Sequence, residues 1–324
     1  MSVTLYRSGL SLLCVGCVYA GSAAAQSYPA KPIRIVIPYG PGGAADVVLR
    51  ILAPQLSENL GQQVVIDNRP GGAGTIGIDM VARSEPDGYT LGMANLTFAA
   101  NPFMISKMPY DTPKDFLPVS LVATQSLALA VNPTLPARSV KGLIELAKVK
   151  SGSLNYASAG NAASNHLATE LFKHLTGVGM THVPYKSGAA AVLSLLSGET
   201  MILFATVPSS LQHFKSGKLI ALAVSTAKRD FMLPDIPTVA ESGLPGYDVY
   251  EWQSLVTPAG APAAVIQRLN REIVNTLSRP DVKERIAGTG ATPVGSTPEE
   301  LGAHIKREMA RWSTVIKAAG IRIE

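Results

Sequence analysis

The chain has 324 residues, of which 47% are hydrophobic and only 16% are charged, so it can bury one large core or two medium ones. Its formal net charge is +5 at pH 7, and no run of Lys or Arg residues concentrates that charge. A surface that follows the phosphates of a nucleic acid is therefore not expected.

Residues 1–25 have the pattern of a secretory signal peptide. Arg7 precedes an apolar run, and small residues up to Ala25 provide a cleavage site. The run is short for a membrane span and contains Ser and Gly; an uncleaved anchor is the alternative. Both cysteines, Cys14 and Cys17, lie in this segment, so the mature chain would have no disulfide and no thiol nucleophile. We therefore expect an exported globular protein, cleaved near Ala25.

Short apolar runs alternate with helical patterns after residue 30. Strands are predicted at 33–39, 63–68 and 89–95, and the first two are each followed by a glycine-rich elbow and a helical segment. Units with this spacing predict a parallel sheet with right-handed crossover connections.

The middle of the chain repeats this scheme. Ser139 is expected to cap a helix that continues to Val149. The pattern then predicts strands and helices at 154–160, 164–177, 188–198, 201–207 and 219–225, after a strand at 127–132. A span dense in Pro and Gly, 233–252, predicts a crossover between packed elements.

The C-terminal third is predicted to be helical. Val265, Leu269, Ile273 and Leu277 recur at a four-residue spacing that is typical of one helix face. Thr297-Pro-Glu-Glu is a capping box with proline at the first helical position, and an apolar stripe for core packing follows it.

The first elbow does not match the nucleotide-binding motifs. A P-loop ends in Gly-Lys-Ser/Thr, whereas Gly43 is followed by Ala44 and Ala45. A dinucleotide fingerprint would have its third glycine where Ala45 stands. Nicotinamide cofactors are also cytoplasmic reagents, which does not suit an exported protein. We therefore expect no cofactor.

The sequence matches the motifs of serine hydrolases and of metal sites only in part. Ser158 lies in Tyr-Ala-Ser-Ala-Gly, where a nucleophile elbow needs glycine in place of Tyr156. A Ser158…Asp…His304 order exists, so a secreted serine hydrolase of the α/β type stays as an alternative. His166 and Glu170 are four residues apart on one helix face, but no third ligand has a convincing spacing, so no metal site is expected.

The strand-to-helix elbows favour a small anion as ligand. The elbows at 38–46, 70–77 and 158–166 contain few ionisable side chains. Each helix start has unpaired N–H groups and a partial positive charge, which suit a carboxylate. Asp46 is expected to cap its own first turn. Polar residues that follow predicted strands could bind a ligand or cap their own helices: Thr97, Ser158, Asn161 and Thr206.

Six sequence blocks in a fixed order then point to a known family. They are PYGPGGAAD at 38–46, NRPGGAGTIG at 68–77, PDGYTL at 86–91, YASAGNAASNHL at 156–167, HVPYK at 182–186 and PTVAESGLPGY at 237–247. From Tyr28 to Glu324 the chain resembles the Bug family, the TctC-like solute-binding receptors of tripartite tricarboxylate transporters.

The resemblance implies a periplasmic, non-enzymatic receptor. Its fold would be α/β and two-lobed, the periplasmic-binding-protein fold of type II, or Venus flytrap, in which each lobe is a mixed, mostly parallel sheet flanked by helices. Lobe one would combine 28–125 with 250–324, and lobe two would be 126–249. Such a monomer would bind a small organic acid, including aromatic, amino and dicarboxylic acids, between the lobes and present it to the membrane permease subunits. A sensor that signals to a membrane protein is a further alternative.

By the same resemblance, ligand contacts are expected from both lobes. Lobe one would contribute Tyr39, Gly43, Ala44 and Thr97, lobe two would contribute Ser158, Gly160, Asn161 and Thr206, and the supporting residues would be Asp46 and His166. The chain has Ala162 and Ala163 where the family often has glycine and serine, and Ala205 with Thr206 where Asp-Asn is frequent. These departures predict a less polar pocket, which would favour an acid with an apolar or aromatic body over a tricarboxylate.

Overall fold

The computed structural model describes residues 28–323, and the structural statements that follow concern this part of the chain. The predicted signal peptide, 1–25, lies outside the described residues. Between residues 28 and 323, no helix combines the length and the apolar character that crossing a membrane requires.

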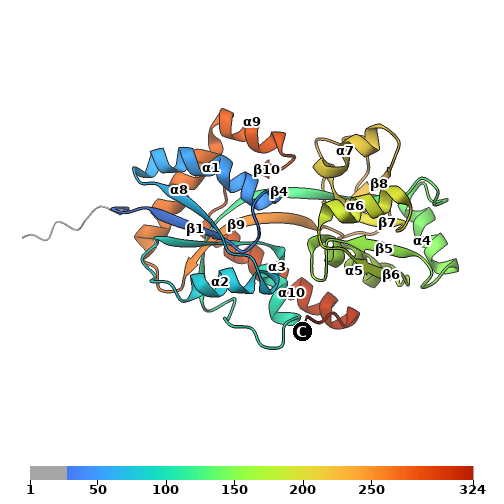
Figure 1. Cartoon of the computed structure of the whole chain (residues 1–324), viewed down its shortest axis with the longest axis horizontal. Helices are drawn as coiled ribbons and strands as arrows, with labels where there is room; N and C mark the ends of the chain where they lie inside the picture. The colour runs from blue at the N-terminus through green and yellow to red at the C-terminus, as the bar shows by residue number, and fades with distance from the viewer. Residues whose placement is uncertain (1–27, 324) are drawn as a thin grey trace, which may run out of the picture.

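Two groups of helices and strands are joined by two long strands, β4 (Phe116–Val131) and β9 (Tyr250–Pro258) (Figure 1). We call the group that contains β1 lobe one and the group that contains β5 lobe two. The strands of the described residues form one hydrogen-bonded path, β2-β1-β3-β9-β4-β7-β5-β6, with β8 and β10 attached to β4. The predicted two-lobed α/β fold with mixed sheets is therefore confirmed.

Lobe one has a parallel block at its outer edge and antiparallel pairs near the connection to lobe two. Strand β1 pairs in parallel with β2 and β3, whereas β9 and β10 run antiparallel to their neighbours. Besides the joining strands β4 and β9, the strands of lobe one are β1 (Ile33–Ile37), β2 (Val64–Asn68), β3 (Thr90–Ala94) and β10 (Thr292–Pro293). Its helices are α1 (Ala44–Leu60), α2 (Thr75–Ala82), α3 (Leu96–Ala100), α8 (Ala263–Ser278), α9 (Pro280–Gly288) and α10 (Pro298–Ala319), with 3-10 turns at Gly72–Gly74 and Asn101–Phe103.

Lobe two repeats the arrangement on the other side of the connection. Strand β5 pairs in parallel with β6 and β7, and β7 and β8 run antiparallel to β4. Its strands are β5 (Asn155–Ser158), β6 (Thr181–Pro184), β7 (Ile202–Thr206) and β8 (Ile220–Val224). Its helices are α4 (Val140–Val149), α5 (Ser164–Thr176), α6 (Gly188–Ser197) and α7 (Val207–Lys215).

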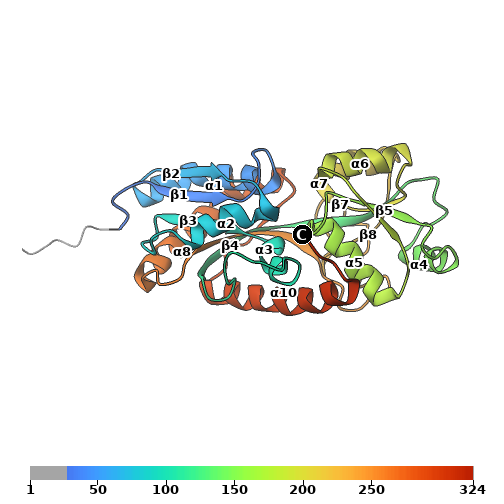
Figure 2. The same cartoon turned by 60° about the horizontal axis from the view of Figure 1, so that its bottom comes forward.

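Helix α10 connects the two lobes on one side of the sheet. Figure 2 shows it running beneath both groups of elements, and it packs on α3 in lobe one and on α5 in lobe two. The predicted capping box is present, since Thr297 and Glu300 each accept a hydrogen bond from the backbone N–H of the other. Trp312 is fully buried, as the predicted apolar stripe requires, and the Trp312 indole donates to Glu308 at 2.9 Å. This helix therefore shares one apolar core with both lobes.

Two strand segments in the connection were not predicted. Residues 116–126 extend the strand expected at 127–132, and β9 starts inside the predicted crossover and continues into the part expected to be helical. Polar residues obscure both patterns, because Ser120, Gln253 and Ser254 are buried in strands that have neighbours on both sides. The Ser254 hydroxyl, for example, donates to the Ala94 carbonyl at 3.1 Å.

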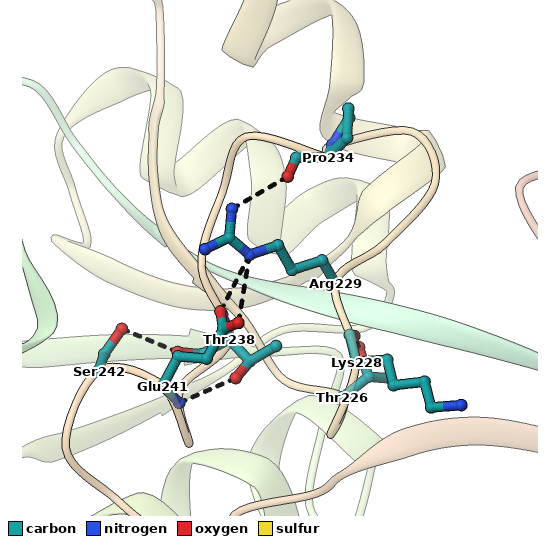
Figure 3. Close-up of polar contacts among 7 residues, drawn as sticks. All are labelled: Thr226, Lys228, Arg229, Pro234, Thr238, Glu241 and Ser242. Atoms are coloured by element: carbon teal, nitrogen blue, oxygen red, sulfur yellow. Dashed lines mark hydrogen bonds and ion pairs between the residues drawn. The ribbon is translucent and has the colours of Figure 1, made fainter.

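Local hydrogen bonds hold the crossover that precedes β9. Arg229 Nε donates to Glu241 Oε2 at 3.0 Å, and Arg229 Nη1 donates to the Pro234 carbonyl at 3.3 Å (Figure 3). The Glu241 N–H donates to the Thr238 hydroxyl at 2.9 Å, and the Thr238 N–H donates to the Glu241 carboxylate at 2.8 Å. Each bond is exposed or only part-buried and contributes little alone, but together they fix a segment with no helix or regular strand.

We propose that the lobes meet at the boundaries expected from the sequence, near residues 125 and 250. Strand β4 pairs with β9 up to Ser126 and with β7 from Leu127 onward, so the change of partner falls at this point. Strand β9 begins at Tyr250, where the crossover returns to lobe one. A hinge needs a few residues that absorb backbone rotation, and we propose that the change of partner inside β4 and the start of β9 provide them.

Candidate functional site

A cavity of about 430 Å³ lies between the two lobes. Lobe one contributes the β1–α1 and β3–α3 connections, lobe two contributes the β5–α5 and β6–α6 connections, and the joining strand β9 forms part of the wall. The lining residues are Tyr39, Gly40, Gly43, Ala44, Ala45, Asp46, Asn95, Leu96, Thr97, Ala159, Ala163, Ser164, Ser187, Gly188, Glu251, Trp252 and Gln253.

Besides the short helix α3, which starts at Leu96 in the lining, three helices begin at this cavity. Helix α1 starts at Ala44, α5 at Ser164 and α6 at Gly188, and each of these residues is part of the lining. The N-cap residues of α1 and α5 are Gly43 and Ala163, neither of which caps its helix with a side chain. Because the first turns keep N–H groups without a side-chain partner and carry partial positive charge, they form a site suited to an anion.

Asp46 anchors the elbow in front of α1. Its carboxylate accepts from the Gly42 N–H at 2.9 Å, from Arg50 Nε at 2.9 Å and from Asn68 Nδ2 at 3.0 Å. Burial acts to raise the pKa of Asp46, but these hydrogen bonds outweigh it and the pKa lies below its usual value. The carboxylate is therefore already saturated by its own chain, although its residue lines the cavity.

Neutral polar groups from lobe one form another part of the wall. The Tyr39 hydroxyl and the Asn95 side chain are hydrogen-bonded to each other at 3.0 and 3.2 Å. Burial raises the pKa of Tyr39, so this hydroxyl stays protonated. Thr97 lies beside this pair in the lining. Tyr39 and Thr97 were both expected to contact the ligand, and their role in binding stays a prediction.

The predicted contacts from lobe two lie elsewhere than the cavity lining. Ser158 is fully buried and hydrogen-bonds to the Gly160 N–H at 3.1 Å and to His182 Nε2 at 2.6 Å. Asn161 is exposed, and the Thr206 hydroxyl is 2.6 Å from Ser209 Oγ. None of Ser158, Gly160, Asn161 and Thr206 belongs to the lining, whereas their neighbours Ala159, Ala163 and Ser164 do. Whether the four residues contact a ligand in another arrangement of the lobes stays a prediction.

His166 supports the elbow before α5. Its Nδ1 accepts from the Ala162 N–H at 3.1 Å, and its ring stacks on His182 with centroids 4.0 Å apart. Ala162 has a φ of 64°, in the left-handed region that is costly for a residue with a side chain. Burial lowers the pKa of His166 to about 3, so the ring is neutral and Nδ1 is free to accept this bond.

One predicted elbow is not part of the cavity, and another was missed. Residues 70–77 lie behind the lining, where an added Cβ at Gly74 would be 3.5 Å from the Tyr39 hydroxyl. The third helix start is instead at Ser187 and Gly188, which follow β6 in the same strand–elbow–helix order. The strand–elbow–helix order could have identified this helix start from the sequence. Lys186-Ser-Gly was not recognised as an elbow because it contains only one glycine.

Glu251 and Gln253 were also missed, because they lie inside the strand that was not predicted. The Glu251 side chain accepts from Ser164 Oγ at 2.5 Å, which joins the start of α5 to β9. Burial raises the pKa of Glu251, and the Ser164 hydrogen bond acts in the opposite direction. The lining contains no Lys, Arg or His among the described residues.

The structure does not form the Ser158…Asp…His304 arrangement that a serine hydrolase would need. The residue bonds to His182 and not to His304, which packs on Tyr250 and Trp252 from α10. Because Ser158 has no exposed surface, a substrate carbonyl has no access to its hydroxyl. Within residues 28–323, no group of three or more His, Cys, Asp or Glu side chains could hold a metal ion.

The chain is similar to proteins of one family along nearly its whole length. The family model described as "Tripartite tricarboxylate transporter family receptor" matches residues 48–321. Protein BugT of Bordetella pertussis is 35% identical over 326 aligned residues, which cover 100% of both chains.

Solved structures show the same fold. The structure of R. palustris Rpa4515 with adipate has a TM-score of 0.80 and 36% identity, and covers 91% of this chain and 99% of that one. MatC (Rpa3494) from Rhodopseudomonas palustris with bound malate has a TM-score of 0.77 and 29% identity, with coverage of 89% and 100%.

Proposed function

The chain belongs to the tripartite tricarboxylate transporter receptor family, and on that premise we propose that it binds a small carboxylate-bearing metabolite in the interlobe cavity. It would act in the periplasm, as a monomer and without catalysis, and deliver the acid to the membrane permease subunits of its transporter. The predicted signal peptide, 1–25, supports this location.

The observation that carries this proposal is the meeting of three helix starts at one cavity. Helices α1, α5 and α6 come from both lobes, and their first turns offer backbone N–H donors to a ligand between them. Backbone donors keep their charge distribution at every pH and need little reorganisation, so they hold a carboxylate without an Arg or Lys side chain. Adipate and malate, which are bound in the two related structures, are both small carboxylates.

Binding would be coupled to closure of the lobes. A ligand that touches α1 in lobe one and α5 and α6 in lobe two has more contacts when the lobes are close together. It therefore shifts the equilibrium toward the closed form by its difference in affinity for the two forms. Strands β4 and β9 would bend at the lobe boundary, and the closed form would be the one that the permease recognises.

The cavity wall favours a ligand with an apolar part. Four alanines contribute methyl groups to the lining: Ala44, Ala45, Ala159 and Ala163. A densely charged tricarboxylate would lose hydration along these surfaces without compensating hydrogen bonds. We therefore propose a mono- or dicarboxylic acid with an aliphatic or aromatic body, in preference to citrate.

A thermal-shift screen of organic acids tests the proposed function. A ligand at a hundred times its Kd stabilises the native state by about 2.7 kcal/mol, which is expected to raise Tm by several degrees in a chain of this length. The best acids are then ranked by titration calorimetry, and any acid that copurifies is identified by mass spectrometry after denaturation. If no carboxylate shifts Tm and none copurifies, the receptor function is wrong for this chain. If citrate binds most tightly, the preference for an apolar body is wrong.

A further inference from the structure

Glu251 lies in the cavity wall with one carboxylate oxygen open to the cavity. It is near the start of β9, and its Oε1 accepts from Ser164 Oγ at 2.5 Å. No hydrogen bond joins Oε2 to another described residue, and Oε2 is not among the buried polar atoms that lack a partner in this part of the chain. This oxygen therefore keeps accessible surface, and the space that the residue lines is the cavity.

Ser164 places the proposed carboxylate site beside Glu251. It is the first residue of α5, one of the helix starts that line the cavity. A ligand carboxylate bound to the first-turn N–H groups of α5 would lie on the same turn as the Ser164 side chain, which contacts Glu251. Two carboxylates would then face each other near the range of about 4–6 Å at which like charges oppose each other's ionisation.

The cavity wall supplies no positive charge to offset this repulsion. Its lining contains no Lys, Arg or His among the described residues. Of the other titratable groups of the lining, the Tyr39 hydroxyl stays protonated and Asp46 is already paired with Arg50. Gln125, which lies opposite Glu251 on the neighbouring strand β4, is neutral. A second negative charge at this place is therefore costly unless a proton neutralises one of the two carboxylates.

Helix α10 does not provide the missing charge from the other side of β9. His304 packs edge-on against Trp252, the next residue along the strand. Burial lowers the pKa of His304 to about 4, so the ring is neutral near neutral pH. Glu308 of the same helix is paired with Arg311 at 3.2 Å. These groups therefore give Glu251 no positive partner.

Resting on the proposed function, we propose that Glu251 couples ligand binding to proton uptake: its carboxyl group becomes protonated when an acid binds at the start of α5. The proton comes from the solvent, so a bound carboxylate adds no net charge to the cavity. The protonated Oε2 donates a hydrogen bond to the ligand carboxylate, while Oε1 keeps its bond from Ser164.

The coupling gives the affinity a pH dependence of definite sign. Burial raises the pKa of Glu251 above its usual value before a ligand binds, and a bound anion raises this pKa further. At a pH between these two values binding takes up protons, so the affinity falls as pH rises through this window. Above the window Glu251 is ionised with or without a ligand, and the affinity becomes constant.

Titration calorimetry in two buffers of different ionisation enthalpy, measured at pH 5.5, 7.0 and 8.5, tests this inference. The probes are adipate, malate, benzoate and any tighter-binding acid of the screen, each measured with the wild type and with Glu251→Gln. We expect the wild type to take up about half a proton or more per ligand, beyond the uptake of Glu251→Gln, at one or more of these pH values. Between pH 5.5 and 8.5 the wild type should lose about tenfold in affinity relative to Glu251→Gln, and the variant should bind more tightly at pH 8.5.

The control variant is Glu145→Gln, which removes one carboxylate from the exposed surface of α4 and should keep the affinity and the proton uptake of the wild type. Glutamine keeps an acceptor for the Ser164 hydroxyl, and the Tm of Glu251→Gln without ligand shows whether this variant is folded. The inference is overturned if the wild type takes up no proton at any of the three pH values, or if Glu251→Gln takes up as much. In those two cases the receptor function stands, whereas binding of none of the probes and of no acid in the wider screen would contradict both.

Discussion

Replacing Ser187 with Asp is expected to weaken ligand binding roughly five- to 150-fold while the fold stays intact. Ser187 caps α6 by accepting from the Ala190 N–H at 3.2 Å, and it lines the cavity. Because Asp is as good an N-cap as Ser, the helix start keeps its cap. A carboxylate about 5 Å from a bound anion repels it by roughly 1–3 kcal/mol at effective dielectric constants between about 20 and 60.

The matched control is Ser139→Asp in the same lobe. Ser139 caps α4 through the same type of bond, from the Gly142 N–H at 3.1 Å, but it is not part of the cavity. Both variants gain one negative charge and keep one cap, so calorimetric affinities should differ only where the charge faces the ligand. Equal affinities in the two variants would show that the anion is not bound near α6.

Replacing Asp46 with Ala is expected to lower the free energy of unfolding by roughly 2–3 kcal/mol and to weaken binding. The change removes the acceptor of the Gly42 N–H and one of the two acceptors of the Asn68 amide. An unsatisfied donor costs about 1–3 kcal/mol, and the low end of this range applies here because both bonds are only part-buried. The elbow in front of α1 loses its anchor at the same time. Urea denaturation measures the stability, and titration with the best acid of the screen measures the affinity.

Asp79→Ala is the control for this variant. Asp79 accepts from Arg83 at 2.9 Å in the same i,i+4 geometry, but 25% of its side chain is exposed against 4% for Asp46. We expect a loss below about 0.5 kcal/mol, as for other exposed pairs. If both variants lose the same stability, Asp46 acts as an ordinary surface pair and does not organise the elbow.

The pH dependence of the Asp46 effect has a definite sign. The pKa of Asp46 is lower in the folded state than its ordinary value, so its contribution is complete above the unfolded pKa of about 4 and is lost as pH falls below that value. The difference in stability between wild type and Asp46→Ala should therefore be constant near neutral pH and decrease in acid.

Most elements of the lobes could be predicted because each has a local signal. Apolar runs followed by glycine-rich elbows marked β1 and β2, and the capping box marked the start of α10. The strands that join the lobes have no such signal. They contain buried polar residues such as Ser120 and Ser254, whose partners come from distant parts of the chain. Periodicity along one segment cannot report these partners.

The candidate site could be predicted only in part, for the same reason. The elbow at 38–46 was placed correctly at the cavity, because its glycines and the helix after it are adjacent in sequence. The elbow at 70–77 has the same local pattern but packs behind Tyr39, and this depends on the tertiary arrangement alone. Glu251 reaches the cavity because β9 crosses between the lobes, which is likewise a property of the topology.

A crystal structure with the tightest-binding acid of the screen tests the central claim most directly. The account predicts electron density between the lobes, with carboxylate oxygens within hydrogen-bonding distance of first-turn backbone N–H groups of α1 and of α5 or α6. Density for the acid outside the interlobe cavity, or a carboxylate held by Lys or Arg side chains in place of these N–H groups, would contradict it.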